Sequence, residues 1–175
     1  MKFYCNVSYK IKRVITVLNK NGDDDAVISL GYNKSWQIKS IRGVIYDEFG
    51  KITLKISEKE FKDESAANDY SLFEDSRMKY FIPAITTYPY TLEYEYEIRS
   101  KHTLSFPDWY PNPSTNVSVE QAVLHFTCKP DFKIRYKEMN YPGKVVTIAN
   151  ADQTTTYTWE VKDIKAIRYE PYSPG

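Results

Sequence analysis

The sequence predicts an all-β fold of about ten short antiparallel strands, arranged as a β-sandwich or a barrel. Three observations support this prediction. Apolar and polar residues alternate with a period of two, turn-forming residues separate the alternating stretches, and aromatic residues make up 15% of the chain. Successive side chains of a strand point to opposite faces of a sheet, so this alternation indicates strands with one buried and one solvated face. Such strands are typical of antiparallel sheets.

The clearest alternation covers residues 90–99, Tyr-Thr-Leu-Glu-Tyr-Glu-Tyr-Glu-Ile-Arg, where every even position is apolar or aromatic. The same alternation predicts strands over residues 52–56, 132–137 and 157–161. Apolar and β-branched content predicts further strands over residues 7–18, 27–32, 36–46, 117–128 and 145–148.

Two glycine-containing turns are expected to close hairpins between consecutive strands. One covers residues 19–23 and the other residues 46–50, and each contains a glycine that can adopt a positive φ. Two further stretches do not fit a strand. Residues 58–70 are polar and are expected to form a short helix or an exposed excursion, whereas the prolines within residues 109–115 predict a loop.

Length and charge limit the possible functions. A chain of 175 residues suits one domain, so a single β-sandwich domain is expected over residues 1–175. The 24 Lys and Arg residues balance 23 Asp and Glu residues, so nucleic acid is not expected as a partner. The longest apolar runs are far shorter than the ~20 residues of a membrane-spanning helix, so no membrane span is expected. No apolar h-region follows the first residues, so a secretory signal is expected to be either absent or removed, and the turn-forming C-terminal residues suggest a piece excised from a longer multidomain protein.

Neither thiol nor metal chemistry is expected. Cys5 and Cys128 are too far apart in sequence to form a CxxC pair. Cys128 and His125 are the residue types of a nucleophile and its base, but three residues of separation on a strand place their side chains on opposite faces. Cys128 is therefore interpreted as a small core residue and His125 as an outward-facing one. The sequence predicts no catalytic residue, no metal ligand and no cofactor.

Acidic clusters offer no better metal site. Asp23–Asp25 lack the ligand spacing of a calcium-binding loop, so they are interpreted as a charged hairpin tip. Asp69, Glu74 and Asp75 are interpreted in the same way, as charged residues of a turn.

Two aromatic residues remain as candidate ligand-binding residues. Trp109 and Tyr110 are followed by Pro111 in the predicted loop, and binding residues are frequently found in loops. Aromatic rings of this kind could form a stacking platform for a carbohydrate or a peptide. Most other aromatic residues are in register with the dry faces of the strands, so they are interpreted as core residues.

Several segments, in this order, resemble one protein family. They are a strand rich in Ile and Leu before a glycine-containing turn, the later turn Tyr-Asp-Glu-Phe-Gly-Lys, and the segments at residues 74–81, 88–97, 157–160 and 170–174. The chain resembles the uncharacterised β-sandwich domain at the N-terminus of bacterial secreted proteins that continue into a transglutaminase-like core. This resemblance implies an immunoglobulin-like sandwich located in the cell envelope, in the periplasm or outside the cell. It also implies that the chain's partner is a downstream domain of the same polypeptide.

The resemblance provides no catalytic residue for this chain. Transglutaminase-like catalysis needs a cysteine at a helix N-terminus with a downstream His and Asp. Cys5 and Cys128 both lie in strand patterns, so neither matches that position. We therefore expect a non-enzymatic structural or interaction domain. The alternative is an independent carbohydrate- or peptide-binding module that uses Trp109 and Tyr110.

Overall fold

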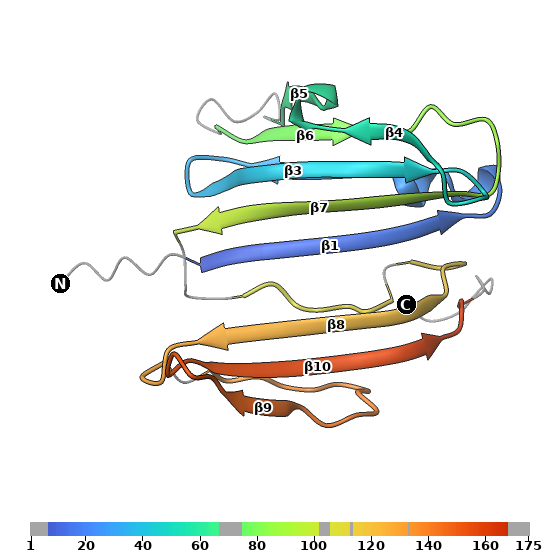
Figure 1. Cartoon of the computed structure of the whole chain (residues 1–175). Helices are drawn as coiled ribbons and strands as arrows, with labels where there is room; N and C mark the ends of the chain where they lie inside the picture. Colours follow the sequence, from blue (N-terminus) through green and yellow to red (C-terminus); the bar gives the residue numbers. More distant parts are fainter. Residues whose placement is uncertain (1–6, 67–74, 102–105, 113, 133, 168–175) are drawn as a thin grey trace, which may run out of the picture. The chain divides into compact units, whose positions relative to one another are not determined.

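The computed structural model describes residues 7–66, 75–101, 106–112, 114–132 and 134–167. These residues form ten β-strands and three short 3-10 turns, without an α-helix. Every strand pairing is antiparallel, which confirms the predicted all-β class. The chain divides into two compact units, residues 1–106 and 107–175, and each is described by itself (Figure 1). The expected single domain over residues 1–175 stays a prediction.

The first unit contains two sheets (Figure 1). The four-stranded sheet has the order β1-β7-β3-β4, with β1 at Val7–Val17, β3 at Trp36–Tyr46, β4 at Ile52–Ile56 and β7 at Tyr90–Ser100. The three-stranded sheet has the order β2-β6-β5, with β2 at Ile28–Tyr32, β5 at Lys62–Ser65 and β6 at Arg77–Phe81.

Both sheets contribute side chains to one core. The alternation of β7 turns its even residues inward, so Leu92 is fully buried and Tyr90 is 2% exposed. Residues from both sheets and from the turns between them complete the cluster: Val17, Ala26, Ile28, Leu30, Ile41, Ile45, Ile56, Phe61 and Tyr94. Two sheets that share a buried core form a β-sandwich, as predicted.

A glycine in β3 makes room for a core aromatic residue. Gly43 is buried and lies opposite Tyr94 of β7. A Cβ atom at Gly43 would lie 3.0 Å from the Glu93 carbonyl oxygen and 3.2 Å from the Tyr94 Cβ. The absence of a side chain at this position therefore lets the two backbones and the Tyr94 side chain pack closely.

The outer face of the four-stranded sheet carries rows of opposite charge. Lys12 Nζ on β1 lies 2.7 Å from Glu93 Oε1 on β7, and Arg42 Nη2 on β3 lies 2.5 Å from Glu95 Oε1. Exposed ion pairs stabilise a fold by only about 0–1 kcal/mol each. Their main effect here is on register, because a one-residue slip of β1 or β3 would turn these charges toward the core.

The two predicted hairpins have different outcomes. The turn after Tyr46 does close a hairpin between β3 and β4, and Gly50 has a φ of 77°. The hairpin predicted at residues 19–23 is wrong, because β1 pairs with β7 whereas β2 pairs with β6 in the other sheet. The chain crosses between the sheets there through the 3-10 turns η1 (Lys20–Gly22) and η2 (Asp24–Ala26).

Asp23 fixes this crossover to the start of β7. The Tyr88 hydroxyl donates to Asp23 Oδ2 at 2.7 Å, and the Tyr90 hydroxyl lies 3.4 Å from Asp23 Oδ1. Burial, followed by the nearby Asp23 carboxylate, raises the pKa of Tyr90 to about 12. Asp23 is therefore a structural acceptor rather than part of the charged hairpin tip that the sequence suggested.

The polar stretch at residues 58–70, which was expected to form a short helix or an exposed excursion, contains a 3-10 turn and also a β-strand in its described part. Residues 58–60 form the 3-10 turn η3 (Glu58–Glu60), which begins with a capping box between Ser57 and Glu60. β5 follows it, and β6 forms the centre of the small sheet. Neither of these two strands was predicted, and residues 67–70 lie outside the described residues.

The second unit is a three-stranded sheet of the order β8-β10-β9. Its strands are β8 at Val119–Cys128, β9 at Val146–Ala149 and β10 at Thr155–Ile164. The strand predicted at residues 132–137 is wrong for the described residues 132 and 134–137, which form no strand. Phe132 stacks on Phe126 of β8, and Tyr136 packs edge-on against Trp159 of β10 at 5.1 Å. These alternating aromatic residues therefore cover the apolar face of the sheet without joining its ladder.

Tyr141 occupies part of the β10 edge that lies beyond β9. Its hydroxyl accepts a hydrogen bond from the Glu160 backbone N–H at 3.1 Å and donates to the Glu160 carbonyl oxygen at 3.3 Å. Gly143 allows this conformation, because a Cβ atom there would lie 2.8 Å from the Tyr141 hydroxyl oxygen. A side chain thus satisfies backbone groups that a longer β9 would have paired.

Truncation of the central core residue should destabilise the fold strongly. Leu92→Ala leaves a cavity in a fully buried site, so the free energy of unfolding should fall by about 2–5 kcal/mol in urea titrations. Leu18→Ala is the matched control because Leu18 is 71% exposed, and its effect should stay within about 0.5 kcal/mol. Equal losses in the two variants would contradict the position of the core.

Candidate functional site

The two predicted ligand-binding residues lie in the second unit, in the non-strand segment 107–112. Tyr110 is 75% exposed and its hydroxyl lies 3.4 Å from Asp108 Oδ2, whereas the Trp109 side chain is half-buried. The loop conformation predicted for this segment is therefore present in its described residues. A role of Trp109 and Tyr110 in binding stays a prediction.

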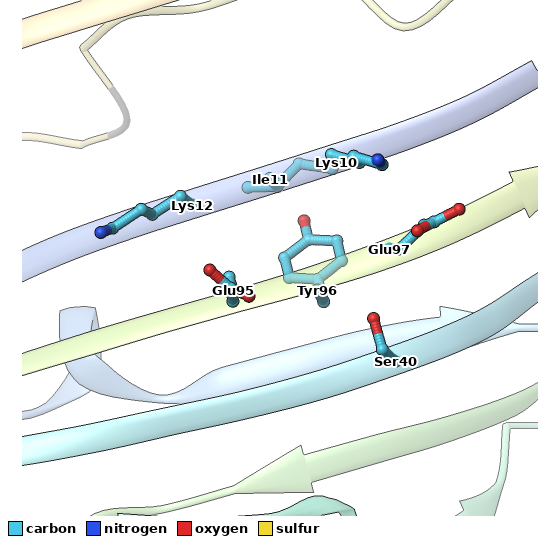
Figure 2. Close-up of a pocket in the computed structure, with 7 residues that line it drawn as sticks. All are labelled: Lys10, Ile11, Lys12, Ser40, Glu95, Tyr96 and Glu97. Carbon is cyan, nitrogen blue, oxygen red and sulfur yellow. The ribbon is translucent and has the colours of Figure 1, made fainter.

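A small pocket lies on the four-stranded sheet and has a volume of about 250 Å³. Figure 2 shows its lining: Lys10, Ile11 and Lys12 on β1, Glu95, Tyr96 and Glu97 on β7, and Ser40 on β3. Its carboxylates already have partners, because Glu95 pairs with Arg42 and Glu97 accepts the Ser8 hydroxyl at 2.6 Å. The pocket is also smaller than the ~300–1,000 Å³ of typical ligand sites.

A larger polar cleft lies in the first unit and has a volume of about 640 Å³. It lies where the small sheet meets the beginning of β3, and its lining comes from β2, β3, β5, β6 and η3. The lining residues are Tyr32, Asn33, Lys34, Gln37, Ile38, Glu58, Ser65, Asp75, Ser76, Arg77 and Lys79. The volume is in the range of ligand sites, so this cleft is the principal candidate site.

Asp63 on β5 is the centre of a hydrogen-bonded network beside this cleft. The Tyr32 hydroxyl donates to Asp63 Oδ2 at 2.6 Å, and Arg77 Nε donates to Asp63 Oδ1 at 2.9 Å. Arg77 Nε also lies 3.0 Å from the Tyr32 hydroxyl oxygen, which closes a triangle across the three strands. The Tyr32 hydrogen bond, followed by Arg77, lowers the pKa of the Asp63 carboxyl.

Lys79 extends the same network toward η3. Its ammonium lies 2.6 Å from Glu58 Oε1 and 3.8 Å from Asp63 Oδ2, and its side chain is 17% exposed. The hydrogen bond with Glu58 raises the pKa of Lys79, so this residue is cationic at neutral pH. Lys34 pairs with Asp75 at the cleft rim. Each of the three cleft cations therefore faces a carboxylate of the same unit.

This charge pairing limits the chemistry of the cleft. A general base needs a pKa near the working pH, and a lysine nucleophile needs a lowered one. The pKa of Asp63 is lowered and the pKa of Lys79 is raised, which is the reverse of what these two roles require. Both groups therefore stay ionised. The arrangement suits a structural ion-pair network, and it could contact a polar ligand only through groups that already have partners.

The cysteine and histidine of β8 do not meet. Cys128 Sγ lies 3.5 Å from the Phe132 carbonyl oxygen, whereas His125 Nδ1 lies 2.9 Å from Thr158 Oγ1 on the exposed face. Burial, and then the nearby Asp131, raises the pKa of the Cys128 thiol. His125 points outward, as predicted, and Cys128 is half-buried. Cys5 lies outside the described residues.

Two members of the acidic clusters considered in the sequence have partners of their own. Asp23 binds two tyrosine hydroxyls and Asp75 pairs with Lys34, whereas Asp69 and Glu74 lie outside the described residues. Within the described part of the chain, no group of three or more His, Cys, Asp or Glu residues could hold a metal ion. No helix in that part is long and apolar enough to span a membrane.

Sequence reasoning missed the Asp63 network. Asp63 and Arg77 lie on the two strands that were not predicted, and Tyr32 comes from a third strand 31 residues before Asp63. No local motif joins these positions, so the sequence contained no signal for this network.

Loss of the Asp63 carboxylate should destabilise the fold in a pH-dependent way. A carboxyl whose pKa is lowered by folding stabilises the native state above its unfolded pKa of about 4. This contribution disappears as the pH falls through the folded pKa. Asp63→Asn should therefore unfold at lower urea than wild type at pH 6, and the difference should shrink near pH 2. A difference that is constant with pH would contradict the assigned network.

Comparison with known proteins places this chain in a family. The chain matches a solved structure from Parabacteroides distasonis, described as a "putative protease", with a TM-score of 0.76 and 16% identity. The match covers 97% of this chain and 34% of that one, so this chain spans about a third of the similar protein and shares its fold. No curated protein matches. Residues 6–168 match the model of a domain of unknown function with a solved structure. The chain therefore belongs to the DUF3857 family.

Proposed function

We propose that this chain is a non-catalytic structural or interaction domain that accompanies a downstream transglutaminase-like domain of papain fold. The observation that carries the proposal is the match of nearly the whole chain to about a third of a longer protein described as a "putative protease". A domain that occupies only part of such a protein leaves room for a separate catalytic domain. The proposed location is the cell envelope, in the periplasm or outside the cell.

The chemistry of the described residues agrees with a non-catalytic role. A nucleophilic cysteine needs a lowered pKa and a base within hydrogen-bond reach. Cys128 has a raised pKa, and the His125 ring contacts Thr158 instead. The cleft cations form ion pairs with carboxylates of the same unit. These groups act in the fold, where partnered charges fix the positions of strands.

The gene beyond codon 175 tests whether a catalytic domain follows this chain in the same polypeptide. We expect the reading frame to continue into a Gly-x-Cys-Trp segment at a predicted helix start, followed by spaced His and Asp residues. A stop codon directly after codon 175 would contradict the accompanying catalytic domain.

The proposal that this chain is itself non-catalytic is tested with the purified chain. We expect no hydrolysis of amide or ester substrates above the uncatalysed rate, and no difference between wild type and Cys128→Ala. Hydrolysis that Cys128→Ala abolishes would show that the chain is itself an enzyme.

An independent carbohydrate- or peptide-binding module is the second candidate function. The 75% exposure of the Tyr110 side chain favours it, because an exposed ring in a loop can stack on a ligand. Glycan arrays and peptide pull-downs with wild type, Trp109→Ala and Tyr110→Ala would detect such binding. Specific binding that these variants lose would establish this function. If wild type binds no glycan or peptide, this second function is contradicted and the accessory role is favoured.

A further inference from the structure

β9 forms one edge of the sheet in the second unit (Figure 1). All four of its residues are exposed, and its two aliphatic side chains, Val146 and Ile148, are 56% and 53% exposed. Natural edge strands are usually very short, or carry a charge, a proline or a bulge that prevents pairing with another chain. β9 is short, with four residues, but it carries no charge, proline or bulge, because its sequence is Val-Thr-Ile-Ala and its pairing with β10 is regular.

The pairing pattern identifies the β9 backbone groups that face this edge. Asn150 donates its backbone N–H to the Thr154 carbonyl oxygen, so Asn150 faces β10. Hydrogen-bonded and non-hydrogen-bonded pairs alternate along an antiparallel ladder. Ile148 and Val146 therefore also face β10, whereas the N–H and C=O groups of Thr147 and Ala149 point to the edge that no other described strand pairs with.

We propose that β9 is a self-association edge, at which a second copy of this chain adds its own β9 in antiparallel orientation. The two-fold axis passes beside Thr147, so the two Thr147 residues form a hydrogen-bonded pair. Val146 of each copy then lies opposite Ile148 of its partner. The same edge meets itself in the same register, which is the requirement for a closed two-fold dimer.

The side chains fit this register. The pair of Val146 with Ile148 is a non-hydrogen-bonded pair, the type in which opposing side chains lie closest. β-branched side chains across such a pair stabilise strand association. Val146, Thr147 and Ile148 are the three β9 residues that this register pairs with each other, and no charges of like sign face each other among them because β9 carries no charged side chain. The joined edges form one continuous six-stranded sheet.

The short edge sets the expected strength. Pairing of only three β9 residues per copy buries far less than the ~1,200 Å² of a stable interface, so the dimer belongs to the weak class. We expect a dissociation constant of roughly 0.1–1 mM, which makes dimers detectable only in concentrated solution. This inference does not depend on the proposed accessory function.

Sedimentation velocity of the full chain from ~10 μM to ~1 mM tests the proposal. Wild type should shift from monomer toward dimer over this range. Thr147→Pro removes an edge-facing N–H without removing a bond to β10, so this variant should stay monomeric. Thr147→Ala keeps the N–H and should associate as wild type does. Unchanged urea midpoints would show that both variants fold.

Variants with lysine or glutamate at the two aliphatic positions of β9 test the register of the proposed dimer. The double variant Val146→Lys/Ile148→Lys places lysines opposite each other in both non-hydrogen-bonded pairs, and Val146→Glu/Ile148→Glu does the same with carboxylates. Each should stay monomeric alone, and an equimolar mixture should form heterodimers. The proposal is overturned if wild type stays monomeric at ~1 mM, if the lysine variant associates as wild type does, or if the mixture does not associate.

Discussion

The double pairing of β7 is the constraint on which the first unit depends. This strand hydrogen-bonds with β1 on one side and β3 on the other over nearly its whole length, and its inward residues fill the centre of the core. The acidic residues on its outward face set the register of both neighbours through contacts with Lys12 and Arg42. A slip of either neighbour would therefore cost buried apolar area and ion pairs together.

The small sheet is attached to this framework by polar as well as apolar contacts. Ile28 and Leu30 of β2 belong to the shared core, whereas Tyr32 at the end of the same strand joins the Asp63 network. The charged cleft thus begins where the apolar core ends. Its pKa shifts keep acids and bases ionised, which suits ion pairing rather than proton transfer.

Sequence reasoning succeeded where one face of a strand is buried and the other is wet. β3 has the predicted bounds, and β7 ends one residue later than predicted, at Ser100. β4 also has the predicted bounds, although only Ile56 of its five residues is buried. β5 was missed because Lys-Asp-Glu-Ser has no apolar face, so hydrogen bonds and charges rather than burial define that strand. A strand was wrongly predicted at residues 132–137, because their alternating aromatic residues pack against Phe126 and Trp159 instead of marking a paired strand. The Asp63 network depends on tertiary pairing, which no local pattern encodes.

Native-state hydrogen exchange measured residue by residue in low urea tests the central role of β7 most directly. A doubly paired strand with a buried face should exchange its amide protons only through global unfolding, with the full free energy of unfolding. The short edge strand β5, whose four residues are all exposed, should exchange through local opening at lower free energy. Exchange of the β7 amides at the same low free energy as those of β5 would contradict the account.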